Sequence, residues 1–594
     1  MIVVINQFRG GINMCGITGF VGKYAIKNAM IGLKSLEYRG YDSAGIAYIT
    51  NNDVMIKKEI GKIENLDKML NYEDESNIAI AHTRWATHGK ATKNNAHPHK
   101  VGKITLVHNG IIENYEELKN KYSDYQFKSD TDTEIIALVI DLLYKEYKDM
   151  LVVLSKVTNI FKGSYALAII NSDYVDTIYA IRKDSPLIVG YDNNSVIVAS
   201  DIPAILHVTN KYYLLDNYDI VKANSNSLTF YNKELKEITK EEYTYEEEKD
   251  EISKNGYVHY MLKEINEEPI VFKKILDKYI SNNKVIDMFD ISKYDEIEIV
   301  ACGSATHAGF LGKHYIEKYA GIKTSVHYAS EYRYSKHFYN KKTLVIVISQ
   351  SGETADTLAA LKLANESNVD TLAIVNVYKS SIAREAKYVL YTLAGVEIAV
   401  ATTKAYMAQS LILLLLALNV KQDTSLIEQL SKVPSILNKY ISKDYKDIAK
   451  IISDYEHIFY LGREVDYYLA LEGSLKLKEI SYIHSEAYPA GELKHGTISL
   501  MDKNTLVISV VTDDSIKDKT ISNLKEVMAR DTSVIAITND DKSISNYKVE
   551  IEENSYLTPF IVMIPMQLIA YEVAKIKKCD IDKPRNLAKS VTVE

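Results

Sequence analysis

The chain has 594 residues, of which 46% are hydrophobic and 25% are charged. This composition is typical of a soluble protein with several globular domains and excludes a disordered or fibrous chain. The formal net charge is −8 and no basic stripe follows the sequence, which argues against nucleic acid as a partner. The longest apolar run, 410–420, is shorter than the roughly 20 residues that cross a bilayer. No membrane span is therefore expected.

The three cysteines, Cys15, Cys302 and Cys579, are too few and too scattered for a disulfide framework or a zinc site. They indicate a reducing, cytoplasmic environment. Residues 1–14 lack the basic region and the small-residue cleavage site of a secretory signal. We interpret them as a leader or a mis-assigned start.

A short apolar strand, CGITGFVG, begins at Cys15, directly after Met14. If Cys15 is the first residue of the mature chain, its own α-amine, with a reference pKa of about 8, can act as general base for the thiol. A lone cysteine near a chain start is more often an inert, buried small residue. The interpretation of Cys15 as a nucleophile therefore depends on the motifs that follow it.

Five motifs follow Cys15 in order: EYRGYDSAG (37–45), AHTRWATHG (81–89), NAHPH (95–99), VHNGIIENY (107–115) and SDTDTE (129–134). Together they resemble the glutaminase domain of the N-terminal-nucleophile, class II glutamine amidotransferases over residues 15–235. The resemblance implies a layered αββα fold that hydrolyses glutamine at an N-terminal cysteine.

The same resemblance assigns roles to individual residues. Cys15 would attack the glutamine amide, and Asn109 with the backbone of Gly110 would form the oxyanion hole. The glutamine-binding set would be Arg84 for the α-carboxylate, Asp132 for the α-ammonium, and Thr87 and His88 in the same pocket. By the resemblance, Trp85, the only tryptophan, would gate an ammonia channel. Without the surrounding motif, a buried aromatic that only packs in the core would be an equally good interpretation.

Five histidines fall within 27 residues (His82, His88, His97, His99 and His108). Their spacing is not that of a helical zinc site, and no cysteine or carboxylate ligands are patterned around them. We expect no metal and no cofactor.

A polar, charged segment at 236–255 indicates a linker or a surface strand pair. The part beyond it contains an internal repeat, because TLVI strands at 343 and 505 lead into similar strand–helix units at an offset of 162. This pattern predicts two doubly wound α/β domains, at 256–430 and 431–580, followed by a C-terminal tail at 581–594.

Two turns of the first repeat are suited to a phosphate group. SQSGET (349–354) and CGSA (302–305) each follow an apolar strand and lead into a helix, where hydroxyls and free N–H groups can bind an anion. A turn of this kind is usually only a helix cap. The predicted sugar-phosphate-binding residues are Cys302, Gly303, Ser304, Ser349, Gln350, Ser351 and Thr354.

These turns resemble the sugar isomerase domain of phosphosugar enzymes. With EIAVATTKAY (397–406), LEGSLKLKEISYIHSEAYPAGELKHG (471–496) and DKPRNLAKSVTVE (582–594), the chain resembles the glutamine–fructose-6-phosphate aminotransferase family from Cys15 to Glu594. The family commonly has CGTS where this chain has CGSA, so Ala305 lacks a hydroxyl that would contact phosphate.

The resemblance also implies the residues of sugar chemistry. His495 would open the ring, Glu479 would move the C1/C2 proton, Lys476 would hold that carboxylate and stabilise developing charge, and Lys589 would form a Schiff base with the ketose. The alternatives from the residues alone are a solvated helix with i, i+4 ion pairs and a mobile terminal lysine.

The expected function is therefore synthesis of glucosamine 6-phosphate from L-glutamine and D-fructose 6-phosphate by a cytoplasmic homodimer. Two other classes of protein are alternatives. A phosphoribosyl- or adenylate-dependent amidotransferase would need an acceptor motif that the sequence lacks. A sugar-phosphate-binding regulator, or an ammonia-dependent isomerase with an inactive glutaminase half, would follow if residues 1–14 masked the amine of Cys15.

Overall fold

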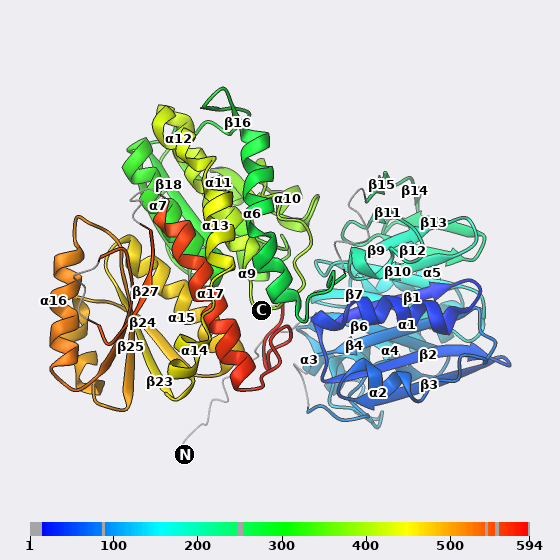
Figure 1. Ribbon diagram of the computed structural model, residues 1–594. Coiled ribbons are helices and arrows are strands. Elements are labelled where there is room, and N and C mark those ends of the chain that lie inside the picture. Colours follow the sequence, from blue (N-terminus) through cyan, green and yellow to red (C-terminus); the bar gives the residue numbers. More distant parts are fainter. Residues whose placement is uncertain (1–14, 86–89, 246–252, 541–544, 553–556, 592–594) are drawn as a thin grey trace, which may run out of the picture. The chain divides into compact units, whose positions relative to one another are not determined.

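A computed structural model describes residues 15–85, 90–245, 253–540, 545–552 and 557–591. Its backbone contacts divide the chain into two compact units, one ending at residue 249 and one spanning 250–589, with residues 590–594 grouped with the first. Each unit is described by itself below (Figure 1).

The first unit contains two large antiparallel sheets. One has the order β15 (Glu242–Thr244), β11 (Lys211–Leu214), β9 (Ile188–Tyr191), β10 (Val196–Ala199), β1 (Gly16–Val21), β4 (Ile78–Arg84), β2 (Ser43–Thr50) and β3 (Asp53–Ile60). The other has the order β14 (Glu237–Ile238), β13 (Ser227–Tyr231), β12 (Ile220–Asn224), β8 (Ile178–Lys183), β7 (Gly163–Asn171), β6 (Ile104–Ile112) and β5 (His99–Val101).

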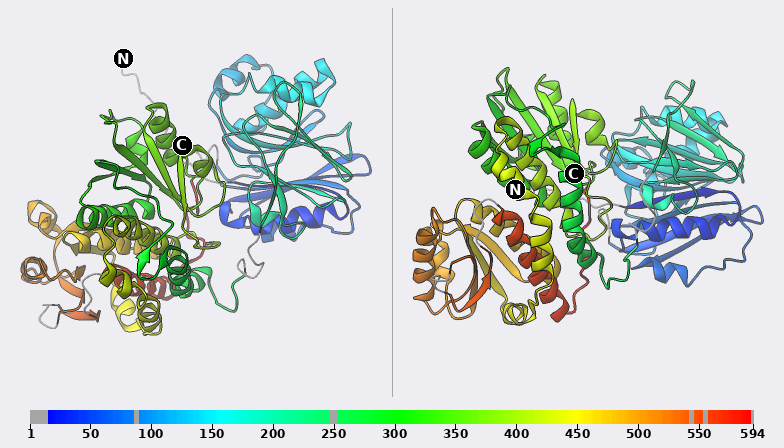
Figure 2. Two further views of the ribbon diagram at one scale, coloured as in Figure 1. Left: turned by 90° about the horizontal axis from the view of Figure 1, so that it is seen from above. Right: turned by 45° about the horizontal axis from the view of Figure 1, so that its top comes forward.

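The inner faces of these sheets pack on each other through small and β-branched side chains such as Ile80, Val107 and Ala168. Helix α1 (Ala25–Ser35) covers β1 and β4 of the first sheet, while α4 (Asp132–Tyr147) and α5 (Met150–Val157) cover the second (Figure 2). Two short helices, α2 (Ile63–Asp67) and α3 (Tyr115–Lys121), complete the unit. This arrangement confirms the predicted αββα fold.

Part of the segment marked as a linker contributes to these sheets. Strands β14 and β15 pair with β13 and β11 as edge strands. Their alternation of charged and half-buried residues is what an edge strand requires.

The second unit contains two five-stranded parallel sheets with the same strand order. The first is β19 (Lys323–Tyr328), β18 (Glu296–Ala301), β20 (Thr343–Ser349), β21 (Asp370–Val375) and β22 (Tyr388–Tyr391). The second is β24 (His484–Pro489), β23 (His457–Gly462), β25 (Thr505–Val511), β26 (Ser533–Thr538) and β27 (Tyr547–Glu550). The shared order confirms the predicted pair of doubly wound sheets.

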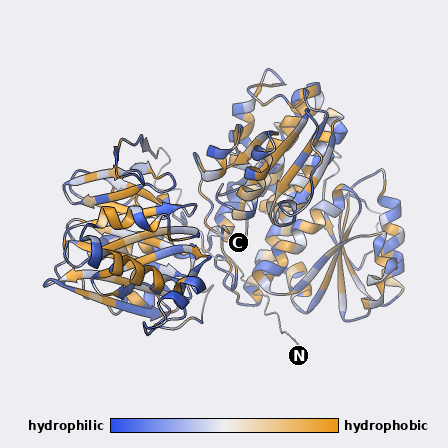
Figure 3. Cartoon of the chain, turned by 180° about the vertical axis from the view of Figure 1, so that it is seen from behind, coloured by the Kyte–Doolittle hydropathy of each residue, from blue (hydrophilic) through white to orange (hydrophobic). Residues whose placement is uncertain are grey.

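Long helices pack around these sheets and form one continuous core that includes residues from both repeats (Figure 3). The main helices are α6 (Tyr260–Tyr279), α7 (Ser304–Tyr315), α9 (Ala355–Glu366), α11 (Lys404–Lys421), α13 (Val433–Ile441), α14 (Lys446–Ser453), α15 (Val465–Ser481), α16 (Lys517–Met528) and α17 (Thr558–Ile576). Short elements are α8 (Ala329–Tyr332), α10 (Ser381–Glu385), α12 (Thr424–Leu430) and the hairpin of β16 (Ile280–Ser281) and β17 (Lys284–Val285).

Two of these helices, α11 and α17, are long and apolar enough to cross a membrane by length and composition alone. In each, however, 83% of the apolar window is buried inside the protein. Core helices of soluble proteins share this pattern, because a helix that is apolar all round is buried on every side.

The start of α6 is held by the C-terminal tail. The carboxylate of Asp582 accepts hydrogen bonds from the backbone N–H groups of Tyr260 and Met261, at 2.9 and 3.0 Å. These are N–H groups that a helix cannot satisfy by itself. Asp582 therefore acts as an N-terminal cap supplied from the far end of the chain.

A fully buried carboxyl group, that of Glu268 on α6, lies in the helical core of the second unit. Neither of its oxygens has a hydrogen-bond partner among the described residues. Burial raises the pKa of Glu268 well above the usual carboxyl value, and the nearby Gln567 opposes this only in part. The group is therefore protonated and neutral in the folded protein.

We expect the Glu268→Gln variant to be more stable than the wild type at high pH. A carboxyl whose pKa is raised on folding destabilises the native state progressively as pH rises above the unfolded value, and glutamine removes this term. The gain should be negligible near pH 4 and exceed about 1 kcal/mol at pH 8, because one pKa unit corresponds to about 1.4 kcal/mol. Calorimetric melting between pH 4 and 9 measures it.

Glu428→Gln, an exposed position on α12, is the matched control and should show no such pH-dependent gain. A Glu268→Gln variant whose advantage is independent of pH would show that Glu268 is not held neutral by burial.

Candidate active sites

Cys15 lies directly before β1, at the place where β1 pairs with the end of β4. The register pairs Gly16 with Thr83, and the Cys15 sulfur lies 3.5 Å from the backbone nitrogen of Trp85. Burial raises the pKa of the Cys15 thiol to about 11, against the opposing effects of the Trp85 backbone and Arg84. The thiol is therefore protonated near neutral pH and needs a neighbouring base before it can attack a carbonyl.

The side-chain amide of Asn109, on β6, is held between Cys15 and a buried histidine. Its Nδ2 donates to the carbonyl oxygen of Cys15 at 2.7 Å, and its Oδ1 lies 3.1 Å from Nε2 of His82. Nε2 of His82 also lies 3.0 Å from the carbonyl oxygen of His108. Because both neighbours are acceptors, Nε2 carries the proton and fixes the amide with its nitrogen toward the cysteine.

Gly110 follows Asn109 with a φ of 127°, a conformation that L side chains rarely adopt. A Cβ atom at this position would lie 2.1 Å from the carbonyl oxygen of Ser164 on the paired strand β7. Any side chain would therefore push β6 off β7 and displace the Asn109 amide.

Two buried side chains of opposite charge, Arg84 and Asp132, lie near Cys15. Arg84 ends β4 and Asp132 begins α4, where its carboxylate accepts the N–H of Ile112 at 2.9 Å. Both act electrostatically on the Cys15 thiol. A buried cation close to a buried anion can bind the α-carboxylate and the α-ammonium group of an amino acid. Thr87 and His88, predicted for the same pocket, lie outside the described residues.

Trp85 is buried beside Cys15, with only 5% of its surface exposed. Its ring packs edge-on against Tyr41 at a centroid distance of 4.9 Å. The gating role of Trp85 stays a prediction.

Three further histidines of this unit, His97, His99 and His108, are bonded to threonines rather than arranged as ligands. Nε2 of His97 and Nδ1 of His108 both lie 3.1 Å from the Thr133 hydroxyl, and Nε2 of His99 lies 3.2 Å from that of Thr131. Burial lowers the pKa of His97 and His99 well below the ordinary value. Among the residues that the structure describes, no group of three or more possible ligands could hold a metal ion.

The two predicted phosphate turns follow β18 and β20, which are neighbouring parallel strands, so both turns lie at one sheet edge. The hydroxyls of Ser349 and Thr354 lie 2.8 Å apart, and Ser349 accepts the N–H of Gly352. Cys302, at the end of β18, contacts the hydroxyl of Thr357 on α9 at 3.7 Å. The turn is thus closed by its own hydroxyls beside the start of α9.

The other residues predicted to bind phosphate make hydrogen bonds to different parts of the second unit. Gly303 has a φ of 56° and leaves open space where a Cβ would lie. Ser304 begins α7 and donates its hydroxyl hydrogen to Glu472 at 2.8 Å, so it is tied to α15. Ser351 accepts the N–H of Glu353 through its hydroxyl, and the carbonyl of Gln350 accepts the N–H of Asn376.

Lys476, on α15, is a fully buried ammonium group between two carboxylates. Its Nζ lies 2.6 Å from Glu479, 3.4 Å from Glu472 and 3.2 Å from the Ser304 hydroxyl. Although burial favours the neutral amine, the two carboxylates raise the pKa of Lys476 to about 12. This arrangement overturns the solvated-helix alternative, because the i, i+3 and i, i+4 pairs here are internal.

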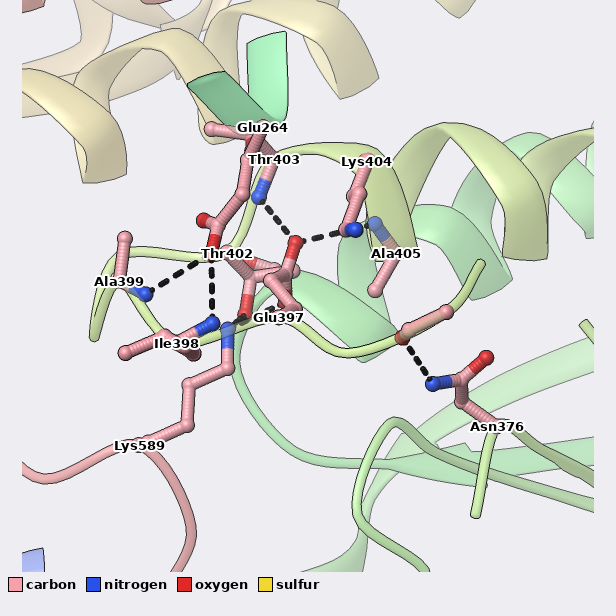
Figure 4. A network of polar contacts seen from close by, with 12 residues as sticks. Glu264, Asn376, Glu397, Ile398, Ala399, Thr402, Thr403, Lys404, Ala405 and Lys589 are labelled. Carbon is pink, nitrogen blue, oxygen red and sulfur yellow. Dashed lines mark hydrogen bonds and ion pairs between the residues drawn. The ribbon is translucent and has the colours of Figure 1, made fainter. Parts of the chain in front are cut away.

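The tail brings Lys589 into a buried network around Glu397 (Figure 4). Lys589 forms an ion pair with Glu397 and bonds the Thr402 hydroxyl at 3.1 Å. The carboxylate of Glu397 also accepts the N–H groups of Thr403 and Ala405, at 3.0 and 3.1 Å. Despite burial, Lys589 and these N–H groups lower the pKa of Glu397. Lys589 is therefore held in place rather than mobile.

His495 ends a short 3-10 helix, Glu492–His495, and its side chain is exposed. Within the described part of the chain, no hydrogen bond or ion pair joins it to the Lys476 group. The structure thus brings Ser304, Lys476 and Glu479 together but leaves His495 outside that cluster.

Comparison with known proteins covers 98% of this chain. The SIS domain family matches residues 290–419 and 451–577, and the glutamine amidotransferase domain family matches residues 82–207. The glutamine–fructose-6-phosphate aminotransferase (isomerizing) of Clostridium tetani is 45% identical over 98% of this chain and 100% of its own length. That of Caldanaerobacter subterraneus is also 45% identical, with the same coverage. The chain belongs to the glutamine–fructose-6-phosphate aminotransferase family.

A solved structure agrees with this membership. The C-terminal domain of the glucosamine–fructose-6-phosphate aminotransferase from Francisella tularensis is 40% identical, with a TM-score of 0.54, over 56% of this chain and 99% of that one. The family expected from the sequence motifs is confirmed.

Sequence reasoning missed several residues of this family member that lie close to the predicted site residues. They are His82, Glu264, His307 and Glu397. Glu264 accepts the N–H groups of Ile398 and Ala399, at 2.5 and 3.1 Å, and burial with the nearby Glu397 raises its pKa to about 8. Glu397 stood inside a quoted motif, but its partner Lys589 lies 192 residues away and no local pattern indicates that pairing.

We expect the Glu397→Gln variant to release the tail, because Lys589 loses its buried counter-ion. Removal of the tail by carboxypeptidase, followed by mass spectrometry, should be about tenfold faster or more. The wild-type tail should loosen only in acid, because a lowered carboxyl pKa gives stability at neutral pH that is lost as pH falls through that value. The exposed control Glu428→Gln should digest as the wild type does. Equal digestion of Glu397→Gln and wild type would contradict the assignment.

Proposed function

We propose that this family member makes glucosamine 6-phosphate from D-fructose 6-phosphate and L-glutamine. It would hydrolyse glutamine in the first unit and aminate the sugar in the second. The proposal is carried by two groups of residues in one chain. In the first unit, the Asn109 amide donates a hydrogen bond to Cys15. In the second, Lys476 is buried between two carboxylates, and the same unit contains the hydroxyl-rich turn of Ser349 and Thr354. We further propose that the enzyme is cytoplasmic.

The glutaminase reaction would begin with transfer of the Cys15 thiol proton to a local base. The raised pKa of this thiol makes such a base necessary, and a free α-amine on Cys15 would supply it. As the sulfur attacks the glutamine amide, the negative charge on its oxygen would be met by the Asn109 amide, which His82 holds in place. Arg84 and Asp132 would hold the charged ends of glutamine.

The sugar reaction would use the cluster around Lys476. Glu479 would move the proton between C1 and C2, and Lys476, whose Nζ lies 2.6 Å away, would hold the Glu479 carboxylate in place and stabilise charge on the enediol oxygens. The turn of Ser349, Gln350, Ser351 and Thr354, with Cys302, Gly303 and Ser304, would bind the phosphate at the start of α9.

Lys589 would form the Schiff base with the ketose carbonyl. The amine must lose a proton before it attacks a carbonyl, and the paired Glu397 carboxylate is positioned to accept it. The exposed His495 would open the ring. Because no hydrogen bond or ion pair in the described part of the chain joins it to the Lys476 cluster, we propose a homodimer in which His495 serves the other copy.

We expect Cys15→Ala to lose glutamine-dependent formation of amino sugar by about 1000-fold or more, because the nucleophile is gone. Formation with ammonium chloride should stay within about threefold of the wild type. Coupled assays of glutamate and glucosamine 6-phosphate measure both, with Cys579→Ala as the control. The intact mass of the purified protein establishes whether the Cys15 amine is free. Persistent glutamine hydrolysis in Cys15→Ala would refute the role of Cys15.

Lys589→Ala should give the opposite pattern. Amino-sugar formation should fall about 100-fold or more with either nitrogen source, because the Schiff base cannot form. Hydrolysis of glutamine, which belongs to the first unit, should continue. Normal sugar turnover in this variant would contradict the Schiff-base assignment.

A further inference from the structure

His307, on α7, is a buried histidine that the proposed reaction does not use. Its side chain is 10% exposed, and its Nδ1 lies 2.7 Å from Oε2 of Glu472 on α15. The contact joins the helix that begins at the phosphate turn to the helix that carries Lys476 and Glu479. It therefore connects two parts of the sugar site that are 165 residues apart in sequence.

The direction of this hydrogen bond follows from chemistry. An ionised carboxylate only accepts hydrogen bonds, so Nδ1 of His307 carries the proton and donates it. Burial works against ionisation of Glu472, but Lys476 and His307 outweigh it and lower its pKa. Glu472 is therefore an anion whose Oε2 is occupied by His307.

The occupation of Oε2 determines what the other oxygen does. Oε1 of Glu472 accepts the Ser304 hydroxyl at 2.8 Å and lies 3.4 Å from Nζ of Lys476. Lys476 lies nearer to Glu479, at 2.6 Å. The Lys476 ammonium therefore interacts more closely with Glu479 than with Glu472. Its interaction with Glu472 stays weaker because His307 already stabilises the Glu472 anion.

Two further groups act on this cluster from neighbouring elements. Glu397, in the loop before α11, acts electrostatically on Lys476, and Tyr406, on α11, interacts with Glu472. Neither donates a hydrogen bond to Oε2 of Glu472 in the described part of the chain. His307 is the donor that this oxygen has.

We propose that His307 is a positioning residue for the sugar reaction, which by pairing with Glu472 keeps Lys476 against Glu479 and Ser304 at the start of α7. Without the His307 donor, the Glu472 anion would draw Lys476 toward itself. Glu479 would then lose the close contact with Lys476 that holds its carboxylate in place. This inference rests on the proposed function of the second unit.

Three substitutions separate this role from simple packing. The amide nitrogen of asparagine can occupy the place of Nδ1, so His307→Asn keeps the donor to Glu472. The amide of glutamine reaches the place of Nε2 instead, so His307→Gln keeps bulk and polarity but loses the donor. His307→Ala loses both. His314→Asn, on the same helix without a hydrogen bond to Glu472, is the control.

The test measures glucosamine 6-phosphate formed from fructose 6-phosphate and ammonium chloride by the full chain. We expect kcat of His307→Ala and His307→Gln to fall about 10- to 100-fold, as small misplacements of catalytic groups do. His307→Asn should stay within about threefold of the wild type, because it keeps the hydrogen-bond donor to Glu472.

The outcomes distinguish the two proposals. If the wild type forms no amino sugar from ammonia, the proposed function fails. If the wild type is active but His307→Gln matches it, or if His307→Asn is as impaired as His307→Ala, the positioning role is overturned. Calorimetric melting checks that the second unit of each variant is folded.

Discussion

The burial of one ammonium group, that of Lys476, constrains the whole second unit. A charge removed from water must be balanced by opposite charge and hydrogen bonds, or the native state pays a large desolvation cost. Glu472 and Glu479 supply the balance from the same helix, and Ser304 and His307 tie this helix to α7. The two carboxylates are thereby held apart in different environments. Both oxygens of Glu472 accept hydrogen bonds from side chains of α7, whereas Glu479 can still accept a proton.

The first unit depends on a different constraint, the antiparallel register of β1 with β4. Pairing of Gly16 with Thr83 brings Cys15 close to Arg84, while β6 presents Asn109 from the other sheet. Because side chains alternate along a strand, a shift of one residue between β1 and β4 would turn the side chains of the shifted strand to the opposite face. Gly110, which cannot carry a side chain here, protects the separate pairing of β6 with β7 next to Asn109.

The sequence predicted the αββα unit, the repeated parallel sheets and the family, because these follow from ordered motifs and from a repeat that the strand order reproduces. It also assigned Ser304, Lys476 and Glu479, from two separate motifs, to the sugar isomerase part, and in the structure these side chains are in contact; their roles stay a prediction. It could not give the partners of charged groups that meet across long separations, such as Lys589 with Glu397 or Asp582 with α6. Pairings of this kind depend on the packing of helices, which no local pattern records. The apolar helix α17 was also not singled out, since Pro565 and scattered polar residues interrupt its run.

The capping of α6 by Asp582 has a practical meaning for handling the protein. The tail is a structural part of the second unit. A purification tag fused to its end would begin only a few residues after Lys589. A tag placed directly ahead of Cys15 would acylate the amine that the proposed glutaminase needs. An epitope is better inserted in the exposed β2–β3 hairpin at Asn51 and Asn52, whose positive φ angles already form a tight turn.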